Sequence, residues 1–292
     1  MLQWKIGDVT VKRIVEMDMP VKYHPKYSLL PQATPEELRK MPWLYPHFVN
    51  EDDMLMMSIH ALLVEAPGMR LVVDTCVGND KPRALNRNLP LSTPFLEHFA
   101  AAGWTRESVN AVVCTHLHVD HVGWNTMKEG DKWVPTFPNA RYLIGKVEYE
   151  HWLKEGDADQ QQILDDSIKP VFDSGLADKV ELNHRISPEL RLIPTTGHTP
   201  GHVSVLIESG GESAVITGDM VHHPSQFTHP GWDDRFDSNA AEAAATRRAF
   251  VKDFGDKPVL VIGTHFAAPT AGHIRRDGGG WRFDGHLTES VT

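Results

Sequence analysis

The feature that most constrains this chain is a run of metal-binding side chains at residues 115–121, Thr-His-Leu-His-Val-Asp-His. It places His116, His118, Asp120 and His121 within six residues. Three fragments follow at long intervals, each with a further histidine or aspartate: Gly197-His198-Thr199, Gly218-Asp219 and Gly263-Thr264-His265. Together they supply five imidazoles and two carboxylates, enough ligands for two transition-metal ions.

Chance is a weak explanation for this run. The chain has 17 histidines, and a lone histidine is more often a surface or core residue than a ligand. A four-ligand run in this order, however, should arise in only roughly a few chains per thousand of this composition. Neither Cys76 nor Cys114 lies in a paired metal-binding spacing, so a structural zinc finger is not expected. Both cysteines are expected to be small core residues rather than disulfide partners.

The fragments that carry these side chains come directly after predicted strands. Residues 109–114 are predicted to form a buried strand that ends where the histidine run begins, so the run is expected on a strand-to-helix loop. A second buried strand at 259–262 ends at Gly263. Further strands are predicted at 9–15, 55–74 as a pair, 140–144, 189–194, 203–208 and 214–217. Helices are predicted at 92–102 with Thr93 as N-cap, at 146–154, and at 240–254 with Asn239 or Ser238 as the cap. Strands alternating with helices imply sheets covered by helices. We expect one domain over residues 1–292, with all the ligand loops along one edge of two facing sheets.

Residues 20–53 are predicted to be a Pro-rich apolar loop. Its six prolines forbid long regular elements, although a short helix at 35–40 with Thr34 as N-cap is compatible with them. The stretch carries Trp43 and Phe48, and a methionine cluster follows at 54–57. It could therefore lie over an apolar cavity or against a second subunit, which makes a homodimer possible.

The charge balance narrows the class of partner. The formal net charge is −10, with acidic residues spread along the chain, whereas nucleic-acid binding needs clustered Lys and Arg. We therefore expect a small-molecule substrate and no nucleic acid. The N-terminus has no apolar signal region and no stretch approaches the ~20 apolar residues of a membrane span, so no membrane partner and a cytoplasmic location are expected.

The motif set as a whole resembles the metallo-β-lactamase superfamily over about residues 55–270. The resemblance implies an α/β fold, an αββα sandwich with two facing mixed sheets and outer helices, and a dinuclear site at the sheet edge. It implies that one ion is held by His116, His118 and His198, and the other by Asp120, His121 and His265. Asp219 would bridge the two. Asp74 resembles the family's structural aspartate near the site, and His202 is expected to support the ligands rather than to bind metal.

The chemistry that this resemblance implies is metal-assisted hydrolysis. Two divalent ions, Zn²⁺ before Mn, Fe or Co, hold a water and lower its pKa to about 7, and the resulting hydroxide attacks a carbonyl carbon or a phosphorus centre. Asp120 could accept or relay a proton to the leaving alkoxide. No serine or cysteine nucleophile is needed.

Within the superfamily, the chain looks most like the acyl-homoserine lactonases and the methyl-parathion-hydrolase-like enzymes. Many such lactonases carry a tyrosine three residues after the bridging aspartate, where this chain has His222. His222 could donate a hydrogen bond to a substrate carbonyl or act as an acid, or it could be an incidental surface residue. An apolar or aromatic pocket is expected from residues 43–57 and from aromatic residues that flank the ligand loops, namely Trp124, Trp133, Phe137, Phe227, Trp232 and Phe266.

These features predict a dinuclear hydrolase of acyl lactones and related esters, a quorum-quenching type of activity. An organophosphate triester or aryl ester hydrolase is the alternative. A thioesterase of glyoxalase II type is less favoured because Arg275-Arg276 is a thin match to its basic binding region. An iron-dependent sulfur dioxygenase would use one ion, and a non-catalytic binding protein would be expected to lack part of the ligand set. Asp219 argues against a true β-lactamase.

Overall fold

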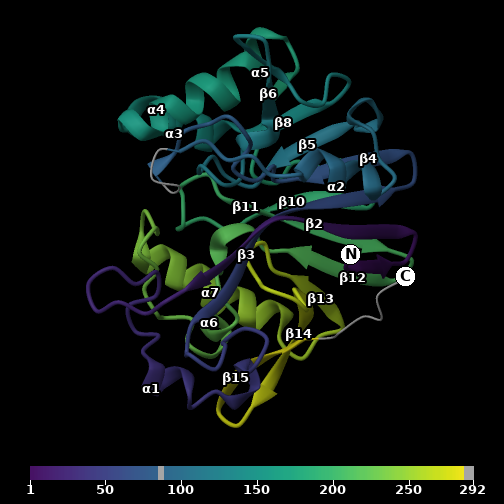
Figure 1. Ribbon diagram of the computed structural model, residues 1–292. Helices are drawn as coiled ribbons and strands as arrows, with labels where there is room; N and C mark the ends of the chain where they lie inside the picture. Colours follow the sequence, from purple (N-terminus) through teal and green to yellow (C-terminus); the bar gives the residue numbers. More distant parts are fainter. Residues whose placement is uncertain (85–88, 286–292) are drawn as a thin grey trace.

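The protein, seen in a computed structural model that describes residues 1–84 and 89–285, is built on two β-sheets that lie face to face. Helices cover the outer face of each sheet (Figure 1). Both sheets are mixed, with parallel and antiparallel pairs. The predicted fold, an α/β sandwich of two facing mixed sheets with outer helices, is confirmed.

The first sheet has the strand order β1-β2-β3-β4-β5-β8-β9. Its strands are β1 Gln3–Ile6, β2 Val9–Val21, β3 Leu55–Ala66, β4 Met69–Val73, β5 Ala111–Cys114, β8 Arg141–Gly145 and β9 Ala177–Val180. β1 to β4 pair antiparallel, and β4, β5, β8 and β9 pair in parallel. Because parallel strands end at the same edge of a sheet, the loops after β4 and β5 meet there.

The second sheet has the order β10-β11-β12-β13-β14-β15. Its strands are β10 Leu190–Pro194, β11 Val203–Ser209, β12 Glu212–Ile216, β13 Val259–Ile262, β14 Ala271–Asp277 and β15 Gly280–Gly285. β12 and β13 pair in parallel, with Ile216 opposite Ile262. The residues that follow these two strands, including Asp219 and His265, therefore also lie at one edge. β6 Thr126–Glu129 and β7 Lys132–Pro135 form a separate hairpin.

The helices lie on opposite sides of the sandwich (Figure 1). On the side of the first sheet are α2 Phe95–Ala101, α3 Lys146–Glu155, α4 Ala158–Ile163, a π-helix at Leu164–Ile168 and α5 Lys169–Asp173. On the side of the second sheet are α6 Ser225–Thr228 and α7 Ala240–Phe254. Asn239 caps α7 by accepting the Glu242 N–H, as the sequence predicted.

Apolar side chains fill the space between the sheets and the space under each helical layer. Between the sheets, residues of the first sheet such as Leu62 and Val113 are packed in one cluster with Val205 and Ile216 of the second. β-Branched and aliphatic side chains dominate this layer because both faces of these strands are covered. The packing fixes the two sheets against each other and so sets the distance between the loops at their common edge.

The segment at residues 20–53 behaves largely as predicted. β2 continues to Val21, and the rest holds short elements, α1 Pro35–Leu38 and a 3₁₀ turn at Pro42–Leu44. The Thr34 hydroxyl accepts the Glu37 N–H, so the predicted N-cap is confirmed. Leu38, Leu44 and Phe48 are packed in the cluster outside the second sheet, with Phe266. The second-subunit contact stays a prediction.

Two local predictions were wrong. Thr93 does not cap α2. Its N–H donates to the Asn79 side chain, and its hydroxyl contacts Asn79 and Glu16. The helix therefore begins at Phe95, with Pro94 at the N-cap position. The histidine run does not lead into an α-helix either. The N–H groups of Gly123 and Trp124 donate to the carbonyls of Cys76 and Thr75, which leaves only a 3₁₀ turn at Gly123–Asn125.

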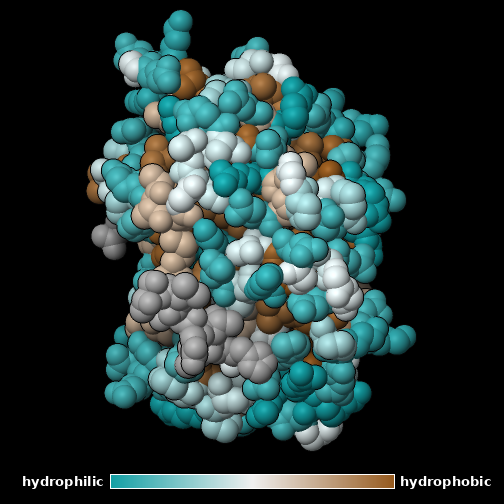
Figure 2. Space-filling view, turned by 90° about the vertical axis from the view of Figure 1, so that its right-hand side faces the viewer, coloured by the Kyte–Doolittle hydropathy of each residue, from teal (hydrophilic) through white to brown (hydrophobic). Residues whose placement is uncertain are grey.

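The surface and the cysteines agree with the composition. Among residues 1–84 and 89–285, no helix has both the length and the apolar character needed to cross a membrane. Figure 2 shows that the face beside the N-terminus carries mainly hydrophilic side chains, with apolar ones scattered between them. Cys76 and Cys114 are buried free thiols, as expected.

Candidate metal centre

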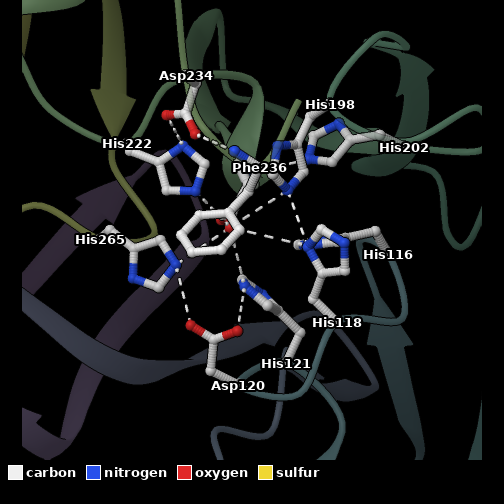
Figure 3. A network of polar contacts seen from close by, with 12 residues as sticks. His116, His118, Asp120, His121, His198, His202, His222, Asp234, Phe236 and His265 are labelled. Carbon is white, nitrogen blue, oxygen red and sulfur yellow. Dashed lines mark hydrogen bonds and ion pairs between the residues drawn. The ribbon is translucent and has the colours of Figure 1, made fainter. Parts of the chain in front are cut away.

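Three imidazoles converge where the two sheets meet. His116 Nε2 and His198 Nε2 each lie 3.0 Å from His118 Nδ1. His116 and His118 follow β5 of the first sheet, whereas His198 follows β10 of the second. The three residues predicted for one ion are therefore brought together by the sandwich, with their ring nitrogens facing a common point (Figure 3).

A second group lies next to the first. The Asp120 carboxylate has one oxygen 3.5 Å from His121 Nε2 and the other 3.5 Å from His265 Nε2. His265 follows β13 of the second sheet, so this group also draws on both sheets. The three residues predicted for the other ion are thus adjacent, and Asp120 is the most exposed of them.

Asp219 lies between the two groups. Its Oδ2 atom is 3.1 Å from His121 Nε2 and 3.2 Å from His265 Nε2. The same oxygen is 3.7 Å from His116 Nε2 and 3.8 Å from His198 Nε2. Asp219 Oδ1 is buried and has no hydrogen-bond partner. An unpaired buried carboxylate oxygen is costly unless a cation or donor completes it, so this position suits a bridging metal ligand.

The outward-facing ring nitrogens are held by neighbouring groups. The contacts are His116 Nδ1 to Thr115 Oγ1 at 3.1 Å, His121 Nδ1 to Asp74 Oδ2 at 2.9 Å, His198 Nδ1 to Asp237 Oδ1 at 3.1 Å, and His265 Nδ1 to the Ser58 carbonyl at 3.0 Å. Such partners fix ring orientation and tautomer and leave the inner nitrogen for a metal. Nitrogen and carboxylate donors of this kind fit Zn²⁺, and also Mn, Fe or Co.

Asp74 links the loop after β4 to the histidine run. Its carboxylate accepts the Thr115 N–H at 2.8 Å and the Thr115 hydroxyl at 2.9 Å, in addition to its contact with His121. Its backbone has φ +57°, a left-handed conformation that aspartate tolerates better than most residues. Asp74 therefore lies beside the ligands, where the resemblance places it.

His202 supports Asp219 instead of joining either group. The Asp219 N–H donates to His202 Nε2 at 2.8 Å, and His202 Nδ1 lies 3.0 Å from the Thr195 carbonyl. Gly218 allows this approach, because a Cβ there would lie 2.5 Å from His202 Nε2. Gly218 also has φ +56°, which favours glycine. The Gly-Asp pair thus sets the backbone from which Asp219 projects.

Burial tunes the protonation of these groups. It lowers the pKa of His116 and His198 well below the usual value, and lowers the pKa of His118 to about 4. These rings are neutral at neutral pH, as metal ligands must be. Burial also acts against a charged His121, but the carboxylates of Asp219, Asp120 and Asp74 outweigh it and raise its pKa. That excess of negative charge is what a divalent cation would neutralise.

His222 is buried within the site, with 4% of its surface exposed. Its Nε2 atom lies 3.0 Å from Asp219 Oδ2, and its Nδ1 atom lies 2.8 Å from Asp234 Oδ2. The incidental surface role is therefore wrong, whereas a role in catalysis stays a prediction. Asp234 and Asp237 were not predicted as site residues, because they lie in the loop before α7 and no sequence motif marks them.

An apolar cavity of about 860 Å³ opens beside the two groups. Asp120, Asp219, His222 and His265 contribute to its lining. Its apolar lining comes from Met19, Val21, Leu29, Met57, Val119 and Ile163, with Tyr27, Arg235 and Phe236 also around it. In the view of Figure 3, the Phe236 ring is drawn in front of the imidazole cluster, and Phe236 lines the same cavity as His222 and His265. Because 57% of its surface is exposed, the ring is available to contact a ligand.

The predicted apolar character of the pocket agrees with this lining, but the aromatic residues expected in it do not. None of Trp124, Trp133, Phe137, Phe227, Trp232 and Phe266, all of which the structure describes, lines the cavity. Trp124 stacks on Phe95 in the core outside the first sheet and donates its indole N–H to Glu16. Phe227 and Phe266 pack outside the second sheet. They support the loops from behind instead of facing the site.

Comparison with known proteins places this geometry in context. The profile of the Metallo-beta-lactamase superfamily matches residues 57–265. An N-acyl homoserine lactonase from Bacillus sp is 27% identical over 162 residues, which are 55% of this chain and 58% of that protein. The N-acyl homoserine lactonase AttM of Rhizobium radiobacter is 29% identical over 117 residues, 38% of this chain and 41% of its own length. The chain thus spans less than two thirds of these relatives.

Solved structures match over nearly the whole chain. The crystal structure of the hydrolase AbOPH, of the beta lactamase superfamily, has a TM-score of 0.81 at 25% identity and covers 98% of this chain and 97% of its own. The dizinc quorum-quenching lactonase AidC, solved with the product N-hexanoyl-L-homoserine, has a TM-score of 0.80 at 21% identity, with the same coverage. At that identity, the likeness to AidC shows the fold.

Proposed function

The chain belongs to the metallo-beta-lactamase superfamily, and we propose that it is a metal-dependent hydrolase of acyl lactones and related esters. The observation that carries this proposal is the position of Asp219, which lies between two groups of metal-binding side chains beside an apolar cavity. Relatives named N-acyl homoserine lactonases support the substrate class.

We propose that the site holds two divalent ions, with Zn²⁺ as the first choice. His116, His118 and His198 would hold one, Asp120, His121 and His265 the other, and Asp219 would contact both. When bound, the ions would supply an activated water and polarise the substrate carbonyl. The residues of the chain then have to bind the acyl group, orient the lactone ring and manage one proton.

The cavity can perform the first of these tasks, which is to bind the acyl group. Its aliphatic and methionine lining can cover an acyl chain, and each buried CH₂ group is worth about 0.8 kcal/mol. The lactone ring would then lie over Asp120 and Asp219, where the cavity meets the polar groups. A substrate that covers the polar end of the cavity would exclude bulk water from its ester carbonyl. The electrostatic contacts to that carbonyl would then be stronger.

Asp120 and His222 supply the proton handling. The Asp120 side chain is 17% exposed and reaches the cavity, so a carboxylate oxygen can pass a proton to the alkoxide oxygen that leaves when the ring opens. His222 presents Nε2 on the same wall, since Nδ1 faces Asp234. An N–H at that position would donate to the carbonyl oxygen as it gains negative charge.

The test is a substrate panel run on purified protein with its metal content counted. The panel holds acyl-homoserine lactones, aryl esters, a phosphotriester and a glutathione thioester, with His116→Ala and a chelator-treated sample as controls. Metal-dependent turnover of lactones well above the other substrates supports the proposal. Fast ester or phosphotriester turnover with inert lactones would replace it by the alternative assignment, and activity that survives both controls would overturn the metal mechanism.

A further inference from the structure

Glu148, in the first turn of α3, is a buried carboxylate that joins two of the ligand loops. Only 1% of its surface is exposed. Its Oε1 atom accepts the Leu117 N–H at 3.1 Å, and its Oε2 atom accepts the Gly201 N–H at 3.0 Å. Leu117 lies between His116 and His118, and Gly201 lies three residues after His198. One side chain thus holds both loops that supply the first group of imidazoles.

The Leu117 peptide is fixed from its other side as well. The Gln160 side chain of α4 donates to the Leu117 carbonyl at 2.9 Å, and the Leu117 side chain is fully buried in the core outside the first sheet. The residue between two predicted ligands therefore has its N–H, its C=O and its side chain all engaged. Little freedom remains for His116 and His118 to change their separation.

Trp152 extends the same arrangement to the His118 ring. Its indole N–H donates to Glu148 Oε1 at 2.6 Å, one helical turn away. Its ring lies against His118, with centroids 5.4 Å apart. Glu148 and Trp152 thus contact His118 through its backbone neighbour and through its ring.

The approach of α3 to the second loop is close enough to require glycine. A Cβ on Gly201 would lie 2.3 Å from the Glu148 backbone nitrogen and 2.6 Å from the Glu148 Cβ. The Gly201 position thus has no room for a side chain, and the loop that carries His198 rests directly on the first turn of α3.

We propose that Glu148 is a positioning residue that sets the spacing of His116, His118 and His198, and with it the affinity for one ion of the pair. This rests on the proposed function, since it needs a metal centre at these residues. Metal sites require ligand distances within about 0.2 Å of their preferred values. Groups that orient ligands from outside typically contribute about 10- to 100-fold to metal affinity.

Glu148→Gln tests the inference because it keeps the shape but replaces one acceptor oxygen by an amide NH₂ that faces an N–H donor. The zinc-loaded protein is dialysed against graded chelator, and retained zinc is counted. A Co²⁺-substituted sample reports ligand geometry through its visible spectrum. We expect the variant to remain folded, to lose one ion at about 10- to 100-fold lower chelator concentration, and to retain the other as the wild type does.

Glu16→Gln is the matched control. Glu16 is also a buried carboxylate, and it accepts the Val77 N–H, the Gly78 N–H and the Trp124 indole N–H at 2.8, 3.2 and 2.7 Å. It has the same kind of donors, but none of them lies between His116 and His118 or beside His198, and Trp124 lies beyond His121 in the connection after β5. We expect Glu16→Gln to lower the free energy of unfolding without changing the chelator concentration at which the ion of His116, His118 and His198 is released.

Several outcomes would overturn the inference. Release of both ions by Glu148→Gln at wild-type chelator concentrations would do so, as would an equal effect of Glu16→Gln. Should Glu148→Gln fail to fold, Trp152→Phe removes one donor to Glu148 and leaves an aromatic ring at that position, and unchanged ion release in that variant would reject the proposal. A wild-type protein that binds no zinc would instead defeat the proposed function, and the inference with it.

Discussion

The ring of His222 stacks on the ring of His265, with centroids 5.4 Å apart and planes within 4° of parallel. The same His222 ring contacts Asp219 through Nε2 and Asp234 through Nδ1. It is therefore held on its face and at both nitrogens. Where the resemblance to acyl-homoserine lactonases leads one to expect a tyrosine hydroxyl, this chain has a fixed imidazole nitrogen next to the Asp219 carboxylate.

Replacement of His222 should lower turnover more than binding. In His222→Phe, the ring can still stack on His265, but the nitrogen beside Asp219 is lost. We expect kcat on an acyl lactone to fall about 100-fold, the typical effect of losing one donor to a developing oxyanion, with a small change in KM and unchanged metal content.

His223→Gln is the control for that measurement. His223 is the buried neighbour of His222, but its ring contacts Ser225 and the Phe48 carbonyl, outside the cavity. The kcat of the His223→Gln variant should stay near the wild-type value. An unchanged kcat in His222→Phe would instead mean that His222 has only a packing role.

Asp74→Asn should weaken the binding of the ion that we assign to Asp120, His121 and His265. The amide can present its NH₂ to His121 Nδ1 or to the Thr115 N–H, and either choice breaks a contact that the carboxylate makes. We expect about 10- to 100-fold weaker binding of one zinc, measured by chelator competition. Loss of the other ion first would contradict the assignment of ligands to the two groups.

Removal of metal should destabilise the protein as well as inactivate it. Zinc at about 100 times its dissociation constant stabilises the folded state by about 2.7 kcal/mol per site. We expect a chelator-treated sample to have a lower Tm in calorimetry, and added Zn²⁺ to restore both Tm and lactone turnover. A Tm that does not respond to Zn²⁺ would argue against ions bridging the two sheets.

Phe236→Ala should reduce discrimination by acyl-chain length. The exposed ring lines the same cavity as His222 and His265 and adds apolar surface to it. We expect the ratio of kcat/KM for a ten-carbon over a four-carbon acyl lactone to fall about fivefold, roughly the contribution of one buried methylene or slightly more.

Leu153→Ala is the matched control for Phe236→Ala. Leu153 is an exposed apolar residue on α3, and it does not line the cavity. The chain-length ratio should be unchanged in this variant. An equal loss of preference in both variants would point to a general effect on folding instead of a contact with substrate.

Lys81 should make stability depend on pH in the alkaline range. It is buried, it donates to the Thr126 carbonyl at 3.0 Å, and burial lowers its pKa to about 7 from 10.5. Between these two values the unfolded chain holds the proton and the folded chain does not, so stability rises with pH. Below about pH 7 the folded chain also carries the Lys81 charge, and the cost of burying that charge is then fully present.

The measurement is urea unfolding of the wild type and of Lys81→Met at pH 7 and pH 9.5. The free energy of unfolding of the wild type should increase relative to that of the variant between these two values. A constant difference between the two proteins would show that Lys81 is neutral, or charged, in both the folded and the unfolded chain over this range.

The sequence predicts the centre of this molecule better than its surroundings. His116 to His121 form a local run with a distinctive spacing, and each later fragment follows an apolar strand, so strand ends could be matched to one edge. Asp234, Asp237 and Glu148 have no such spacing, because their contacts with His222, His198 and Leu117 are made across the fold. The role of such a buried carboxylate can be inferred only from the structure, where the loops that it contacts lie together.

The cavity shows the same limit. Apolar character could be anticipated from residues 43–57, of which Met57 does line the cavity. The bulky aromatic residues near the ligand loops were misplaced, because such residues contribute most when they are buried in the cores that support a loop. The smaller side chains of Val21, Leu29 and Ile163 come from segments far apart in the sequence.

The ligand groups each take residues from both sheets, and the chain passes from the first sheet to the second between β9 and β10. A protein cut in that connection would yield two fragments, neither of which has the full set for either ion. Zinc would then bind tightly only after the fragments had reassociated, and it would favour their reassociation. Metal uptake by the split protein would thus be a direct reporter of complementation between its halves.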